Sequence, residues 1–201
     1  MKPKRKRELI AAYKISAAVL ATALALTFLL GTSCGVPDEP KSADGWFRKG
    51  KAYADDEVYG KAIECLTKAI EIDPEYAKAY AYRGYSYYRM IQYEEAIQDL
   101  EKAMKLDPIF SEISCYYIGN IYHKMENYEE AIKNFTKAIE INPEEADYYY
   151  DRACAYDRLR MLYEAEKDFR KACALGESSG CEAAADIVKD RMEMEKKEKS
   201  E

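Results

Sequence analysis

One sequence motif occurs four times in this 201-residue chain, and this repetition constrains the fold more than any other feature. The four copies span residues 59–74, 93–108, 128–143 and 162–177, at spacings of 34, 35 and 34 residues. A repeat of this length is one supersecondary unit, which cannot bury its apolar face alone. The sequence therefore predicts a stack of four units, each packed against its neighbours.

A second set of shared positions lies upstream of each copy. In the first repeat these upstream residues are an aromatic residue, a small residue four positions later and a tyrosine: Trp46, Gly50 and Tyr53. Within the copy itself the shared residues are Ala62, Leu66, Ala69 and Pro74. This pattern resembles the tetratricopeptide repeat. The third repeat departs from it, with Cys115 in the aromatic position and one extra residue, Ser111. The fourth has Ala153 in place of glycine and no closing proline.

The resemblance implies an all-α fold, an α-solenoid of four helix-turn-helix repeats. The expected repeats are 43–76, 77–110, 112–145 and 146–179, and residues 180–201 are expected to form a capping helix and a charged tail. The glycine of each of the first three repeats lets the two helices approach closely. The proline that closes these repeats ends the second helix, because it disfavours helical backbone in the residue before it.

Residues 1–33 have the organisation of an export signal or membrane anchor. A basic stretch, KPKRKR at residues 2–7, precedes an apolar run from Ile15 to Leu30. Residues 1–33 carry a net charge of +5, and the rest of the chain carries −11. The positive-inside rule then predicts that the basic stretch stays in the cytoplasm and that residues 35 onward lie outside. Residues 34–42 are expected to form a polar tether.

Three fates are open for this segment. The sequence LLGTSC, which ends at Cys34, resembles a bacterial lipoprotein signal, although Gly31 stands where that family usually has an aliphatic residue. The resemblance implies cleavage and acylation of Cys34. The 20 residues from Ile15 to Cys34 also suffice for an uncleaved helix across a bilayer about 30 Å thick. Ordinary cleavage near Ser33 would instead release the chain. All three predict an exported protein on the periplasmic or cell-surface side, anchored to the membrane in the first two.

The six cysteines include one suggestive pair. The segment from Cys173 to Cys181 resembles Sel1-like repeats, in which such cysteines pair across adjacent helices. The resemblance implies a disulfide between these two residues, and the alternative is that both are small buried apolar side chains. We interpret Cys65, Cys115 and Cys154 as packing residues.

The tetratricopeptide resemblance also implies where a ligand binds. In that family, ligands lie in a concave groove lined by the first helix of each repeat. The corresponding positions here are aromatic and mildly basic: Lys51, Lys78, Tyr85, Tyr88, Arg89, Tyr116, Asn120, His123, Lys124 and Tyr150. Tyrosine offers a wide apolar face and a hydroxyl group, which suits peptide recognition. The alternative is that these tyrosines only pack on their neighbours.

Composition and motifs argue against several other functions. The chain has a single histidine and no pattern of clustered Cys and His, so we expect no catalytic site, no metal site and no cofactor. The acidic body argues against nucleic-acid binding, which needs a basic surface. Two functions remain: a membrane-tethered scaffold that binds a protein or peptide partner, or a structural subunit of an envelope complex that self-associates.

Overall fold

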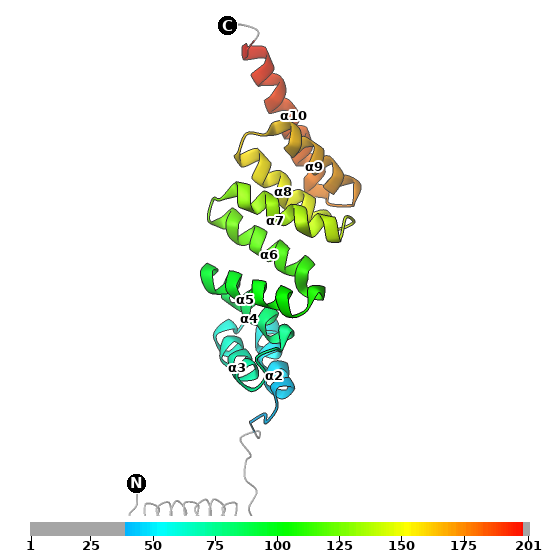
Figure 1. Ribbon diagram of the computed structural model, residues 1–201. Coiled ribbons are helices and arrows are strands. Elements are labelled where there is room, and N and C mark those ends of the chain that lie inside the picture. Colours follow the sequence, from blue (N-terminus) through cyan, green and yellow to red (C-terminus); the bar gives the residue numbers. More distant parts are fainter. Residues whose placement is uncertain (1–38, 199–201) are drawn as a thin grey trace, which may run out of the picture. The chain divides into compact units, whose positions relative to one another are not determined.

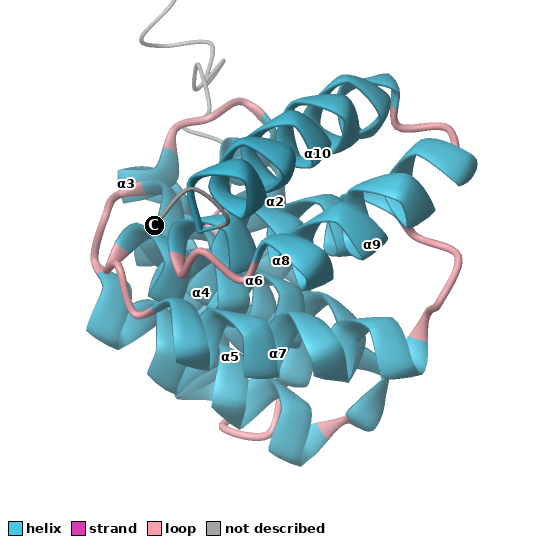
Figure 2. Cartoon of the chain, turned by 90° about the horizontal axis from the view of Figure 1, so that it is seen from above, coloured by secondary structure: helices cyan, strands magenta, loops and turns pink. Residues whose placement is uncertain are grey.

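The computed structural model describes residues 39–198, and these residues are almost entirely helical (Figures 1 and 2). The predicted export segment, Cys34 and the first part of the tether lie outside the described residues. The elements within that range are α2 (Ala43–Asp55), α3 (Tyr59–Ile72), α4 (Ala77–Arg89), α5 (Tyr93–Leu106), the short 3-10 helix η1 (Pro108–Phe110), α6 (Ser111–Lys124), α7 (Tyr128–Ile141), α8 (Ala146–Arg158), α9 (Leu162–Ala174) and α10 (Ser178–Glu198).

The helices pair in sequence order and the pairs stack, which confirms the predicted α-solenoid. Each pair consists of a first helix (α2, α4, α6 or α8) and a second helix (α3, α5, α7 or α9). Successive first helices contact one another, whereas successive second helices make at most marginal contact. The layer of first helices is therefore the inner, concave side of the stack, which we call the groove.

Close packing within each pair depends on a small residue of the first helix. A Cβ atom added at Gly119 would lie 2.7 Å from two ring carbons of Phe135, whose side chain is fully buried. Leu66 and Leu100 face the equivalent glycines of the first two repeats in the same way. The glycine therefore allows α6 to approach α7 closely enough to seal the core around Phe135.

The turn between the two helices has the same backbone in every repeat. One residue with positive φ follows each first helix: Glu57, Ile91, Glu126 and Arg160. The next amide donates a hydrogen bond back to the carbonyl five residues earlier, as from Val58 to Tyr53 at 2.8 Å. This is the Schellman arrangement that closes a helix, and it gives all four hairpins one geometry.

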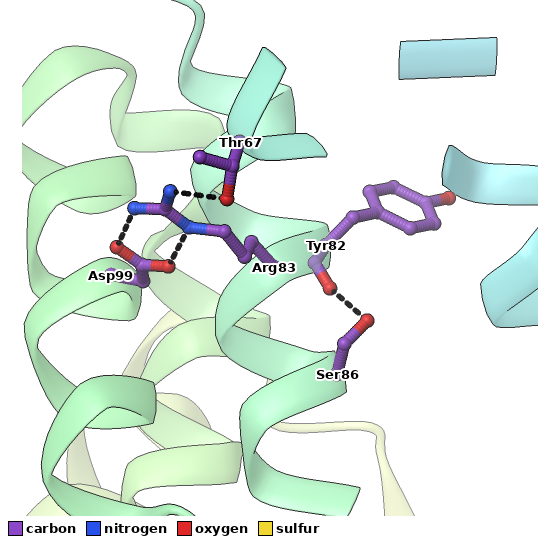
Figure 3. A network of polar contacts seen from close by, with 5 residues as sticks. All are labelled: Thr67, Tyr82, Arg83, Ser86 and Asp99. Carbon is purple, nitrogen blue, oxygen red and sulfur yellow. Dashed lines mark hydrogen bonds and ion pairs between the residues drawn. The ribbon is translucent and has the colours of Figure 1, made fainter. Parts of the chain in front are cut away.

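An arginine links successive repeats at two of the three junctions. Arg83 of α4 donates to Asp99 of α5 through Nε at 2.6 Å and Nη2 at 2.9 Å, and to Thr67 Oγ1 of α3 at 3.0 Å (Figure 3). The side chain thereby holds together the second helices of repeats 1 and 2. Both charged groups are largely buried, so removing either one leaves an uncompensated charge.

The same arrangement recurs 69 residues later, where Arg152 bonds Asp168 and Thr136. The junction between repeats 2 and 3 lacks it, because the buried Ile118 occupies the arginine position there. In place of the aspartate, Asn134 donates to a backbone carbonyl of its own helix. The stack therefore consists of two similar halves, each with one arginine link.

The last helix covers the end of the stack. Ala184 and Ile187 of α10 are buried in a cluster with Phe169 of α9. A disulfide joins Cys173 of α9 to Cys181 of α10, the pair implied by the Sel1-like resemblance. Among the other cysteines in the described range, Cys65 and Cys115 are buried and Cys154 is partly buried. None of the helices within residues 39–198 has the length and apolarity needed to cross a membrane.

The glycine contact yields a matched pair of substitutions. Gly119→Ala should destabilise the protein by about 1–3 kcal/mol, because the buried Phe135 ring has no free space to move into. Gly60→Ala should be neutral or stabilising by up to about 1 kcal/mol, since a Cβ atom there meets nothing within 4 Å. Urea unfolding followed by circular dichroism measures both. Equal effects would contradict the packing argument.

The arginine link predicts a large loss on removal of its acid. Asp99→Ala should destabilise the protein by about 3 kcal/mol, because Arg83 then lies in a largely buried place without a countercharge. Glu101→Ala removes an exposed partner of Lys105 and should change stability by less than about 1 kcal/mol. The same urea titrations test this. A loss for Asp99→Ala no larger than that for Glu101→Ala would refute the role given to the link.

Candidate peptide-binding groove

The residues predicted to line the groove all lie on the layer of first helices. They are Lys51 on α2; Lys78, Tyr85, Tyr88 and Arg89 on α4; Tyr116, Asn120, His123 and Lys124 on α6; and Tyr150 on α8. Lys78, Arg89 and Lys124 are exposed, whereas the four tyrosines are only partly accessible. A ligand could therefore reach most of these basic side chains but only part of each tyrosine.

Tyrosine rings form a continuous row of contacts across the repeats. The row runs through Tyr59, Tyr85, Tyr117, Tyr116 and Tyr148, with successive ring centroids 6.1, 5.1, 5.6 and 4.8 Å apart. These distances are those of favourable aromatic pairs. The rings thus pack on one another, as expected if the tyrosines serve to pack on their neighbours. This packing also holds in place the rings that border the groove.

Side chains at the fifth position of one repeat contact those at the sixth position of the next repeat. At the junction of repeats 1 and 2, Phe47 at the fifth position contacts Tyr82 at the sixth position of the next repeat, with centroids 5.3 Å apart. At the junction of repeats 3 and 4, the Tyr116 hydroxyl at the fifth position donates to Asp151 at the sixth, at 2.9 Å. A large side chain therefore bridges both outer junctions.

At the middle junction the fifth position is Ala81, which makes no such bridge. The Tyr117 ring is contacted there by Tyr85 and Tyr88 of α4, with centroids 5.1 and 5.6 Å away. Here a hollow of about 290 Å³ opens between α4 and α6, and we call it the central hollow. The extra residue of the third repeat and helix η1 lie at the same junction. The hollow is mainly apolar, and its walls are Ala81, Tyr82, Tyr85, Leu100, Phe110, Ile113 and Tyr117.

The tyrosine hydroxyl groups of the groove are protonated at neutral pH, and burial raises their pKa further. It raises the pKa of Tyr117 to about 12, and it also raises the pKa of Tyr116 and of Tyr88. At neutral pH these side chains are uncharged phenols that can donate a hydrogen bond. The groove therefore offers apolar faces and neutral polar edges along most of its length.

Two of the predicted basic residues are already paired with acids. Lys51 donates to Asp55 at 2.6 Å on the same helix. Arg89 lies 3.6 Å from Glu57, which belongs to the turn of the preceding repeat, and donates to the Tyr85 hydroxyl at 2.7 Å. The groove is therefore less basic than the number of its Lys and Arg residues indicates.

A second hollow of about 370 Å³ lies between repeats 3 and 4. It is bordered by His123, Lys124, Glu126, Tyr128, Cys154, Asp157, Arg158 and Phe169. Burial, Lys124 and Arg158 lower the pKa of His123, so its ring is neutral at pH 7. Burial and nearby carboxylates raise the pKa of Cys154 to about 11, so its thiol is a poor nucleophile. This hollow has more charged side chains at its border than the central hollow.

Models of the tetratricopeptide repeat match residues 77–110, 113–145 and 134–167, and a further TPR repeat model matches residues 50–90. The chain belongs to the tetratricopeptide repeat family. Members of this family are typically non-catalytic scaffolds for protein interaction, and the matches support a protein-interaction scaffold.

Solved structures of the same fold support the assignment. MamA is 30% identical over 67% of this chain and 73% of its own, with a TM-score of 0.62. A second MamA structure is 24% identical and covers 89% of this chain and 97% of its own, with a TM-score of 0.65. The pilF protein of Pseudomonas aeruginosa is 22% identical over 75% of this chain and 69% of its own, with a TM-score of 0.65. No curated protein matches the sequence.

Sequence reasoning missed some residues that shape this tetratricopeptide groove. Tyr82, Tyr117 and Asp151 all occupy the sixth position of a repeat, which the family pattern does not assign to the groove. A signal was nevertheless present, because the fifth position is Phe47, Tyr116 or Tyr150 in three repeats and alanine in one. Comparison of that position across the repeats would have located the central hollow.

Proposed function

We propose that this chain is a membrane-tethered adaptor that binds an extended peptide segment of a partner protein in its groove, outside the cytoplasmic membrane. The observation that carries the proposal is the central hollow. Its walls are mainly apolar, and it opens between the first helices of repeats 2 and 3, where the fifth position of the repeat is alanine.

The hollow has the size and chemistry of an anchor pocket. An engineered cavity of about 150 Å³ in another protein holds benzene, so a hollow of about 290 Å³ can accept one aromatic or large aliphatic side chain. Phe47 shows the expected contact at the neighbouring junction, where its ring meets Tyr82 edge-on. A peptide side chain in the central hollow would supply to Tyr117 the contact that Ala81 is too short to make.

The basic stretch and apolar run of residues 1–33 support the location. All readings of that segment send the repeats across the cytoplasmic membrane, and two of them keep the chain attached to it. The polar tether at residues 34–42 would separate the groove from the membrane surface. A tethered groove of this kind would hold its partner near the envelope.

Filling the hollow tests the proposed binding site. The full chain in detergent micelles would be panned against a phage-displayed library of twelve-residue peptides, and the selected peptides would be synthesised. Ala81→Phe should weaken their binding by about tenfold or more, because the introduced ring occupies the anchor pocket. Isothermal titration calorimetry measures the affinities.

Ala52→Phe is the matched control, since Ala52 is exposed on α2 and borders neither hollow. It should leave the affinity unchanged. Equal binding by wild type and Ala81→Phe, or a library from which no peptide is enriched, would count against peptide binding at this site.

Metabolic labelling with palmitate tests the lipoprotein form of the tether. The wild-type chain should incorporate label, and Cys34→Ser should abolish it, because Cys34 is the acylated residue in this proposal. Cys65→Ser should keep the label, since Cys65 is buried in the first repeat. Incorporation that survives Cys34→Ser would exclude acylation at this cysteine.

A further inference from the structure

Asp151 differs from Asp99 and Asp168, the buried aspartates of the second helices α5 and α9. Each of those carboxylates is held by an arginine through two hydrogen bonds. Within residues 39–198, no Lys, Arg or His side chain lies within 4.0 Å of the Asp151 carboxylate. A desolvated carboxylate without a countercharge is costly, so this position would gain from a cation.

The surroundings of Asp151 hold the carboxylate in a fixed place. Its Oδ2 accepts a hydrogen bond from the Tyr116 hydroxyl at 2.9 Å. The Tyr116 ring is itself packed between Tyr117 and Tyr148, with centroids 5.6 and 4.8 Å away. The hydroxyl of this packed ring thus orients the carboxylate through Oδ2, and Oδ1 can accept a hydrogen bond from another donor.

The charged groups around Asp151 do not neutralise it. Burial is the main cause of its raised pKa, the neighbouring Asp147 adds to the rise, and the Tyr116 hydrogen bond and Lys124 oppose it. Lys124 is exposed and lies beyond ion-pair distance. The two acids together outweigh this single lysine, so the local charge is negative.

Aromatic rings complete the surroundings of a cation site. Tyr88 lies near enough that the Asp151 charge raises the pKa of its hydroxyl, and its ring packs 5.6 Å from that of Tyr117. Faces of aromatic rings attract Lys and Arg side chains. The chain already uses this contact nearby, where the Arg89 guanidinium lies 4.8 Å from the Tyr59 ring centroid.

We propose that Asp151, together with Tyr88 and Tyr116, forms a subsite for the basic side chain of a peptide whose bulky apolar side chain fills the central hollow. This inference rests on the proposed function and specifies the partner. The central hollow lies between α4 and α6, and Asp151 faces the next junction, between α6 and α8. Adjacent packed helices are about 10 Å apart. An extended peptide covers that distance in about three residues.

The peptide selection described above tests this specificity. Selected peptides should carry Arg or Lys about three positions from a bulky apolar residue. A synthetic peptide of that sequence would then be compared with the same peptide in which citrulline, which is uncharged and similar in shape, replaces arginine. The wild-type chain should bind the citrulline peptide about tenfold more weakly.

Substitution of the acid should remove this discrimination. Asp151→Asn should bind both peptides with equal affinity, because the amide still accepts the Tyr116 hydrogen bond but carries no charge. Asp186→Asn, an exposed aspartate of α10, should discriminate as the wild type does. The proposed subsite would be refuted if the selected peptides showed no preference for Arg or Lys, or if the wild type bound the two peptides equally. Neither result would contradict the apolar anchor pocket. A library that yields no peptide would instead overturn the proposed function itself.

Nuclear magnetic resonance decides the question if Asp151→Asn fails to fold. The carboxyl carbon of Asp151 in the wild-type chain would be titrated with each peptide bound. The arginine peptide should lower the pKa of Asp151, because a bound cation favours the charged form. The citrulline peptide should not lower it. The same pKa with both peptides would refute the subsite.

Discussion

Each repeat of this chain depends on its neighbours for burial, and the rest of the structure follows from that dependence. Two short helices cannot form a core alone, so each pair must present an apolar face to the next one. The core around Trp46 accordingly includes Ala79, which belongs to the second repeat. The small residue of each first helix and the large residue of the second helix bring the two layers close enough for this packing.

The junctions between repeats are not equivalent, although the repeats are similar. The outer two have both an arginine link and a large side chain that bridges the first helices. The middle junction has Ile118 in place of the arginine and Ala81 in place of the bridging residue. Both departures occur at the junction that contains the extra residue and helix η1. The candidate anchor pocket therefore lies where the regular packing is interrupted.

Much of the fold could be predicted from the sequence, because spacing and small residues report on contacts within a repeat. The proline and the Gly–Leu pattern recur in register, so the helix pairs and their stacking follow directly. The groove was harder to predict, since its character depends on contacts between repeats. Arg89 looks like a free basic residue until Glu57 of the preceding turn is placed beside it. Asp151 likewise becomes distinctive only when no basic side chain of residues 39–198 is found within ion-pair distance of it.

The interrupted junction has a mechanical consequence. In a linear array, stability is the sum of the repeats and of the contacts between nearest neighbours, so the array is most compliant at its weakest contact. The junction between repeats 2 and 3 lacks the arginine link that each half of the stack has. A ligand seated in the central hollow would touch both halves and add a contact across this junction. Binding of the partner in the central hollow would then stiffen the whole stack. The partner would act as a ligand and would also stabilise the fold.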